Sequence, residues 1–228
     1  MIRNLTHTIS LALLGLFVFS CEPEPTVPDQ EKIYGVYFLD YNEAENKTNA
    51  RASFYLNAPP ATNTQKLELT HPSNVKYNNK LLVFDTKERY YTKDFVSLIE
   101  SNFTYENYYG NQYGNVVTMV DSIDLFMSDS ANSQNDFYFQ VDGSPLQANE
   151  VIEIYVESLN SDLTFGSTFT SMSGLNIQIS ADQLSSLGLG PTLVRASRSM
   201  SINTGVNGPP VGGEVQTRYS VQDTVIIH

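Results

Sequence analysis

Cysteine is almost missing from this sequence. The 228 residues contain one cysteine, Cys21, and no tryptophan. A single cysteine excludes a disulfide within the chain and a metal site built from thiolates. The folded part must therefore be stabilised by its hydrophobic core. The missing tryptophan removes the largest aromatic platform that a protein can offer to a sugar ring.

Positive charge is scarce as well. Lys and Arg number 13 against 25 Asp and Glu, which gives a formal net charge of −12. No part of the sequence resembles a basic stripe, so phosphate backbones and anionic membrane surfaces meet no attractive field. We therefore expect no nucleic acid partner.

One apolar run near the N-terminus is too short to span a membrane. Residues 11–21 read LALLGLFVFSC, and their length fits the h-region of a secretory signal, below the ~20 residues of a transmembrane helix. The last four residues, VFSC, resemble a bacterial lipobox, with an aliphatic residue three positions before the cysteine and a small residue directly before it. The resemblance implies that residues 1–20 are a lipoprotein signal peptide and that Cys21 is lipidated and begins the mature protein.

Proline and acidic residues fill the next stretch. Residues 21–32 read CEPEPTVPDQEK, and proline at this density favours an extended polyproline II chain. We expect a stiff tether here. Acidic residues directly after a lipidated cysteine also resemble the surface-export signals of Bacteroidota lipoproteins. That resemblance implies a lipid anchor in the outer membrane and display on the cell surface, while an orientation toward the periplasm stays open.

From residue 33 onward, apolar residues alternate with polar ones at a period of two. Residues 50–57, read ARASFYLN, are one example, and this pattern is typical of a half-buried strand. Further candidate strands are residues 35–41, 66–70, 80–84, 103–109, 116–127, 137–141, 152–156, 163–170, 175–180, 192–203 and 213–227. One helix is expected at 180–187, where Ser180 and Gln183 form a capping-box pattern before Gly188. The sequence predicts an all-β fold.

A polar stretch divides this pattern into two parts. Residues 128–135 read SDSANSQN and predict a domain boundary. We therefore expect two tandem antiparallel β-sandwiches, residues 33–128 and residues 135–228. One larger sandwich with a long polar hairpin at this point stays open.

Two local patterns resemble immunoglobulin-like domains. One is the two-turn helix that precedes a glycine and a late strand, and the other is NNKLL at residues 78–82. Both are similar to features of immunoglobulin-like domains in Bacteroidota surface lipoproteins. The resemblance implies an immunoglobulin-like fold for both sandwiches and an address at the cell surface.

Few residues could support catalysis. Of the three histidines, only His71 lies inside a predicted domain, and we interpret it as a turn residue because Pro72 follows it. Asp121 and Asp124 are three residues apart in a candidate strand, so their side chains would point to opposite faces. No nucleophile-elbow pattern is present. We expect a non-catalytic protein.

Metal ligands are equally few. Asp129, Asp136 and Asp142 are scattered through polar segments and match no EF-hand loop. We interpret them as solvated acids, and we predict no metal site and no cofactor.

The segment with the most unusual composition is FTYENYYGNQYGN, residues 103–115. Tyr105, Tyr108, Tyr109 and Tyr113 supply flat amphipathic rings beside asparagine amides, a chemistry that recognises sugars or protein surfaces. Tyrosine is also a strong strand former, and alternation would bury Tyr105. A ligand-binding loop and a structural hairpin are therefore both consistent with this segment.

These observations favour a membrane-anchored, non-catalytic lipoprotein that acts as a surface binding or assembly module, with a protein or a glycan as partner. Two alternatives stay open. One is a fimbrial-type structural subunit that assembles by strand donation. The other is a glycan-binding accessory protein of a nutrient-uptake system.

Overall fold

The computed structural model describes residues 32–56, 66–171, 174–203 and 212–228. Across these ranges nearly every element is a strand, and the one helix is short. The predicted all-β fold is therefore confirmed. The predicted signal peptide, residues 1–20, lies outside the described residues, and so do Cys21 and the tether up to residue 31.

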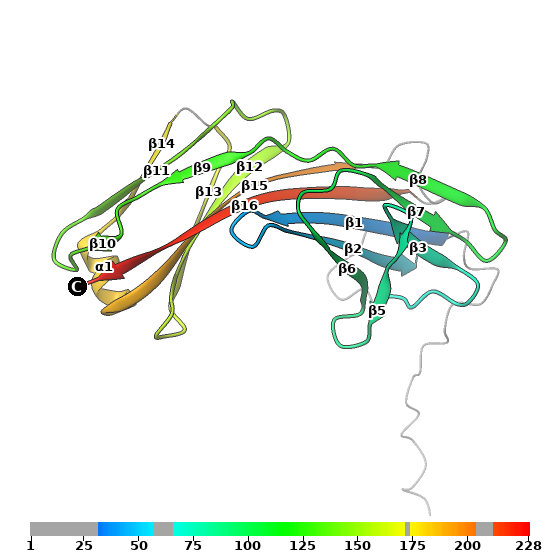
Figure 1. The fold of residues 1–228 in the computed structure, drawn as a ribbon, viewed down its shortest axis with the longest axis horizontal. Helices are drawn as coiled ribbons and strands as arrows, with labels where there is room; N and C mark the ends of the chain where they lie inside the picture. The colour runs from blue at the N-terminus through cyan, green and yellow to red at the C-terminus, as the bar shows by residue number, and fades with distance from the viewer. Residues whose placement is uncertain (1–31, 57–65, 172–173, 204–211) are drawn as a thin grey trace, which may run out of the picture.

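The largest sheet contains nine strands and runs along the whole molecule, which is elongated and arched (Figure 1). In spatial order its strands are β13 (Thr164–Phe169), β12 (Glu150–Ser158), β15 (Gly190–Asn203), β16 (Gly213–Ile227), β1 (Ile33–Asn42), β2 (Lys47–Leu56), β6 (Tyr90–Val96) and β5 (Val83–Asp85), with β10 (Ser130–Ala131) paired to β16.

Two smaller sheets form the second layer. One has the order β14 (Leu175–Ile179), β11 (Phe137–Gly143) and β9 (Ile123–Phe126), and the other has the order β4 (Lys80–Leu81), β3 (Asn74–Tyr77), β7 (Asn102–Glu106) and β8 (Gln112–Val116). They lie toward opposite ends of the molecule, and the helix α1 (Ala181–Leu187) lies near the C-terminal end (Figure 1).

The buried side chains of the large sheet share one face. Tyr41 of β1 is the register partner of Tyr219, Tyr219 is opposite Arg198, and Arg198 is opposite Ile152. All four are buried, and directly opposite residues point to the same side of a sheet. Both small sheets therefore cover the same face of the large one.

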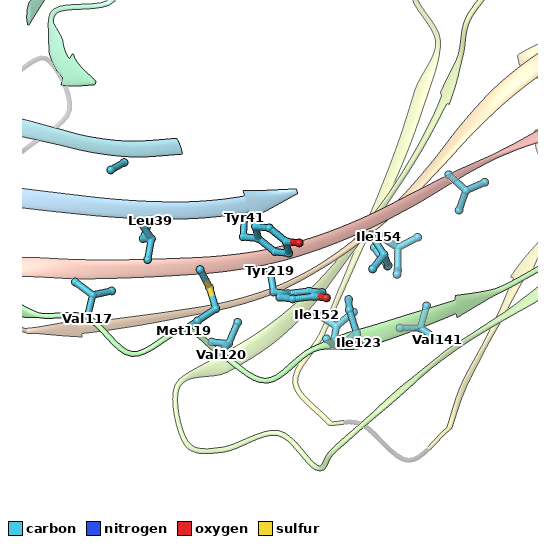
Figure 2. Close-up of a cluster of buried hydrophobic side chains, with 14 of the residues drawn as sticks. Leu39, Tyr41, Val117, Met119, Val120, Ile123, Val141, Ile152, Ile154 and Tyr219 are labelled. Atoms are coloured by element: carbon cyan, nitrogen blue, oxygen red, sulfur yellow. The ribbon is translucent and has the colours of Figure 1, made fainter. Parts of the chain in front are cut away.

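This arrangement differs from two separate sandwiches at residues 33–128 and 135–228. β16 pairs in parallel with β1 along Gly35–Asn42, so a strand of the second predicted domain lies inside the sheet of the first. The core is continuous as well: Figure 2 shows Met119, Val120 and Ile123 between the two halves, beside Tyr219 and Ile152. The reason is the length of β15 and β16, which each extend through both halves.

Several local predictions are confirmed. Ser180 accepts a hydrogen bond from the backbone N–H of Gln183, and the Gln183 side chain accepts one from the backbone N–H of Ser180, which is the expected capping box of α1. Asn78 and Asn79 both have positive φ, at 49° and 57°, and close the β3–β4 hairpin. Such a pair matches the right-handed twist of the flanking strands.

Other strand predictions are wrong. Of residues 66–70, only Leu67 forms an isolated bridge, with Phe54. The predicted strand 116–127 is divided between the end of β8 and β9. The strands β3 and β6 were not expected: β3 alternates but has only four residues, and the polar residues Thr92, Lys93 and Asp94 interrupt the alternation in β6.

An aromatic cluster fills the half of the molecule that contains β1 and β2. The ring centroids of Tyr37 and Phe103 are 5.1 Å apart, those of Tyr77 and Phe103 are 4.6 Å apart, and those of Phe54 and Tyr105 are 5.1 Å apart. All five side chains are fully buried. Such rings bury large apolar areas, so the small sheet β4-β3-β7-β8 is held mainly by aromatic packing.

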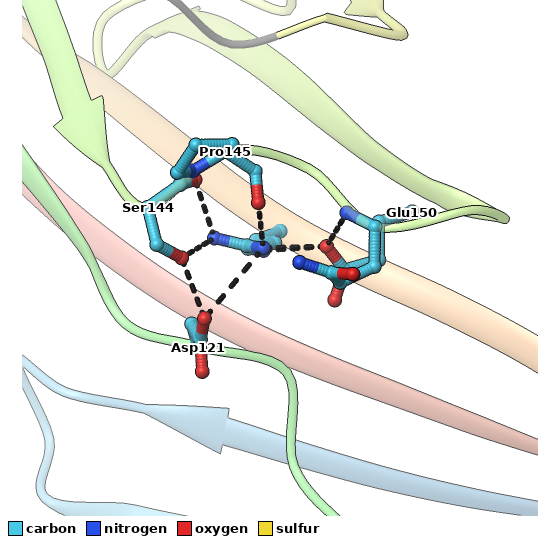
Figure 3. Close-up of polar contacts among 6 residues, drawn as sticks. Asp121, Ser144, Pro145 and Glu150 are labelled. Carbon is cyan, nitrogen blue, oxygen red and sulfur yellow. Dashed lines mark hydrogen bonds and ion pairs between the residues drawn. The ribbon is translucent and has the colours of Figure 1, made fainter.

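A fully buried arginine holds the junction between the two halves. All five N–H groups of Arg198 have acceptors: Nε and Nη2 donate to Glu150 Oε2 at 3.2 and 2.5 Å, Nη1 donates to the oxygens of Ser144, and Nη2 donates to the Pro145 carbonyl. The Asp121 carboxylate lies 3.9 Å from Nη2. Figure 3 shows that these contacts tie the segment before β9 and the loop before β12 to the large sheet.

We expect Arg198→Met to destabilise the protein by about 3–5 kcal/mol, because it leaves the buried Glu150 carboxylate without a cation. Urea unfolding measures this loss. Arg195→Met is the matched control, since Arg195 lies on the other face of β15 with one side-chain hydrogen bond, to Gln222, and its loss should cost about 1 kcal/mol. Equal losses in both variants would contradict a special role for the buried arginine.

Candidate functional site

The four tyrosines of the predicted binding loop lie in three different environments. Tyr105 is fully buried and burial raises the pKa of its phenol. Tyr113 is half-buried and stacks on Tyr105, with ring centroids 5.9 Å apart. Tyr108 and Tyr109 are exposed at the hairpin tip. Tyr105 therefore cannot meet a ligand at the surface, because its strand position turns it into the aromatic core.

Asn107 shapes the tip between β7 and β8. Its side-chain oxygen accepts hydrogen bonds from the backbone N–H groups of Tyr109 and Asn111, at 3.0 and 2.9 Å. Gly110 has a φ of 79°, a conformation that glycine adopts without strain. The rings of Tyr108 and Tyr109 meet edge to face, and the loop presents them to solvent.

The position of this tip limits what it can contact. β7 runs toward the beginning of β1, since its Phe103 contacts Tyr37 and its Tyr105 contacts Phe54, the cross-strand partner of Gly35. The tip therefore lies at the end of the molecule where β1 begins. A tether that leads into β1 would place it on the anchored side.

The uncovered outer face of the large sheet holds a second group of residues. Phe38 of β1 lies on this face, with the guanidinium carbon of Arg51 4.5 Å from its ring centroid and that of Arg218 5.1 Å away. The arginines come from β2 and β16, the two neighbours of β1. Such stacking holds a guanidinium in place while its N–H groups stay available in the ring plane.

Arg51 and Arg218 differ in their hydrogen bonds. Arg51 Nη2 donates to Asp40 Oδ2 at 3.1 Å. Arg218 forms an ion pair with Glu153, with Nη2 and Oε2 3.9 Å apart, and its buried Nε has no hydrogen-bond partner among the described residues. Since 3.9 Å is too long for a hydrogen bond, Nη2 of this half-buried guanidinium can still donate to an acceptor supplied by a ligand.

Two shallow hollows flank the stacked arginines. One, of about 310 Å³, is lined by Phe38, Val151, Glu153, Gln216 and Arg218, together with serines of β15. The other, also about 310 Å³, is lined by acidic, amide, cationic and aromatic side chains: Asp40, Asn42, Glu45, Lys47, Asn49, Arg51, Tyr90 and Asp94. Both combine hydrogen-bond donors, acceptors and apolar surface.

The carboxylate of Asp40, which lines the second hollow, has a shifted pKa. Burial raises the pKa of Asp40 above its ordinary value, although the nearby Arg218, Arg51 and Arg195 act in the opposite direction. Asp40 therefore stands in the middle of the arginine group, where its charge offsets part of theirs. The sequence analysis missed this group, because its members lie on separate strands and come together only through the register.

The other residues that the sequence analysis considered, His71 and the aspartates, lie in turns, in structural contacts or at the surface. His71 lies in a turn, as predicted. Asp121 lies before β9, not within a strand, and reaches the Arg198 contacts. Asp136 accepts hydrogen bonds from the backbone of Ala181 and the side chain of Gln178, so it supports the start of α1.

The other two aspartates are exposed: Asp129 lies just before β10, and the Asp142 carboxylate accepts a hydrogen bond from the next backbone N–H. Among the residues that the structure describes, no three His, Cys, Asp or Glu side chains come together to hold a metal ion. No helix in these ranges is both long and apolar enough to cross a membrane.

Comparisons with known proteins add no relative. No protein-family model matches the sequence, and no curated protein matches it. The function must therefore be argued from the surfaces described above.

We expect Tyr105→Ala to lower the free energy of unfolding by about 3–5 kcal/mol, because it removes a buried ring. The double variant Tyr108→Ala/Tyr109→Ala should change it by less than about 0.5 kcal/mol, since both rings are exposed. Urea or thermal unfolding compares the two. A large loss in the double variant would mean that the tip packs on the sandwich.

Proposed function

We propose that this protein is an exported lipoprotein, anchored in the outer membrane through Cys21, that binds a ligand at the cell surface without catalysing a reaction. The VFSC sequence before residue 22 and the proline-rich segment after it support the address. A lipid anchor with two or more acyl chains gives stable membrane attachment.

The binding surface that we propose is the outer face of the nine-stranded sheet. The observation that carries this proposal is Arg218, a half-buried guanidinium that stacks on Phe38 and whose Nη2 lies 3.9 Å from Glu153, too far for a hydrogen bond. The Tyr108/Tyr109 tip is a weaker candidate, because it lies at the end of the molecule where the tether enters.

A saccharide suits the chemistry of this face. Arg218 and Gln216 can donate to hydroxyl oxygens, and the Glu153 carboxylate can accept from hydroxyl groups. Phe38 and Val151 add apolar surface in the same hollow. The acids Glu153 and Asp40 offset much of the arginine charge, so a neutral oligosaccharide fits better than an anionic one.

We expect the full chain, purified in detergent micelles, to bind neutral oligosaccharides on a glycan array. Arg218→Met should weaken the Kd about 10- to 100-fold, because a charged hydrogen bond contributes ~1.5–3 kcal/mol. Lys76→Met is the matched control: it removes the same charge from β3, in the other layer. Equal binding by both variants, or no binding to any glycan, would contradict the proposed surface.

The proposed lipid anchor and outer-membrane localisation have their own test. Cys21→Ser should abolish incorporation of radiolabelled palmitate and move the protein out of the outer-membrane fraction. Persisting lipid label in Cys21→Ser would show that another residue carries the anchor, and wild-type protein without label would refute lipidation.

A further inference from the structure

One segment of the sequence carries no charge. Residues 163–180 contain no Asp, Glu, Lys, Arg or His, although 17% of the whole sequence is charged. This segment supplies both β13 and β14. The first is the last strand of the nine-stranded sheet, and the second is the last strand of the sheet packed on it.

β13 is an open edge. It pairs with β12 along Thr164–Phe169, and within the described ranges no strand pairs with its other side. Phe165 and Phe169 pack against the core, while Gly166, Ser167 and Thr168 are exposed. Its outer N–H and C=O groups are therefore free to pair with a further strand.

The opposite edge of the same sheet is protected. β5 has only three residues and ends in the charged Asp85, with Lys87, Glu88 and Arg89 following after Thr86. Short length and charge are the usual means by which an edge strand avoids pairing with another chain. β13 has six residues, none of them charged and none proline, and Asp162 is two residues before it.

Exposed apolar side chains lie next to this edge. Leu159 and Leu163 in the β12–β13 loop are 53% and 47% exposed, and Leu189 is 66% exposed. Asn160 of the same loop donates a hydrogen bond to the Leu189 carbonyl, so Leu189 lies beside this loop. The open edge therefore continues into an apolar surface.

We infer that β13 is the interface at which two copies of this chain pair, edge to edge and antiparallel, into one continuous sheet. A two-fold contact of this kind is self-complementary, since each copy offers the same free backbone groups. The distribution of charge favours a second copy of the chain as the partner. Two chains of net charge −12 repel each other, whereas the strand β13 itself brings no charged side chain to the contact.

Sedimentation velocity of the full chain in detergent micelles tests the interface. The wild type should form a dimer whose fraction rises with protein concentration. Ser167→Lys places a charge at the centre of the edge and should weaken dimerisation at least tenfold. Val83→Lys, at the exposed start of β5, is the matched control and should dimerise like the wild type.

A second variant, Thr168→Lys, keeps the test possible if Ser167→Lys does not fold. Thermal unfolding confirms that each variant is folded. A folded Thr168→Lys or Ser167→Lys variant that dimerises as tightly as the wild type overturns the inference. A wild type that stays monomeric at every concentration also overturns it, and it would leave the β13 edge to a strand from another protein. These outcomes do not depend on glycan binding, which is measured at residues on other strands.

Discussion

The rest of the fold depends on the pairing of β15 with β16. Their register runs without a break from Gly190 opposite Ile227 to Asn203 opposite Glu214. β12 pairs with β15 near one end of this ladder, and β1 pairs with β16 near the other end. Because the same two strands belong to both halves, neither half can lose them and keep its sheet. Arg198, in the middle of β15, adds a fully satisfied guanidinium at the point where the loops of the second layer cross.

This scaffold determines which surfaces are free. Both small sheets cover one face of the large sheet, and none of the described strands covers the opposite face. There, polar side chains from neighbouring strands lie in rows, and stacking on Phe38 orients Arg51 and Arg218. A rigid sheet holds such groups more accurately than a loop does. The outer face therefore combines orientation with accessibility, whereas the Tyr108/Tyr109 tip is an exposed loop at the end of the molecule where β1 begins.

The alternation in the sequence was enough to predict the fold class, most strands and the capping box of α1, because these features depend on neighbouring residues. The alternation could not predict the parallel pairing of β1 with β16, because this pairing joins the two ends of the folded chain. One signal was overlooked: residues 192–203 and 213–227 are too long for strands of an ordinary sandwich. At the candidate site, alternation correctly indicated the burial of Tyr105, but the group around Phe38 depends on register between three strands.

Hydroxyl-radical footprinting of the full chain, with and without a bound neutral oligosaccharide, tests the central claim most directly. Aromatic rings react readily, and both surfaces contain them. The account predicts that the ligand protects Phe38 and leaves Tyr108 and Tyr109 as reactive as before. Protection of Tyr108 and Tyr109 alone, with Phe38 unchanged, would contradict it and move the binding site to the β7–β8 tip.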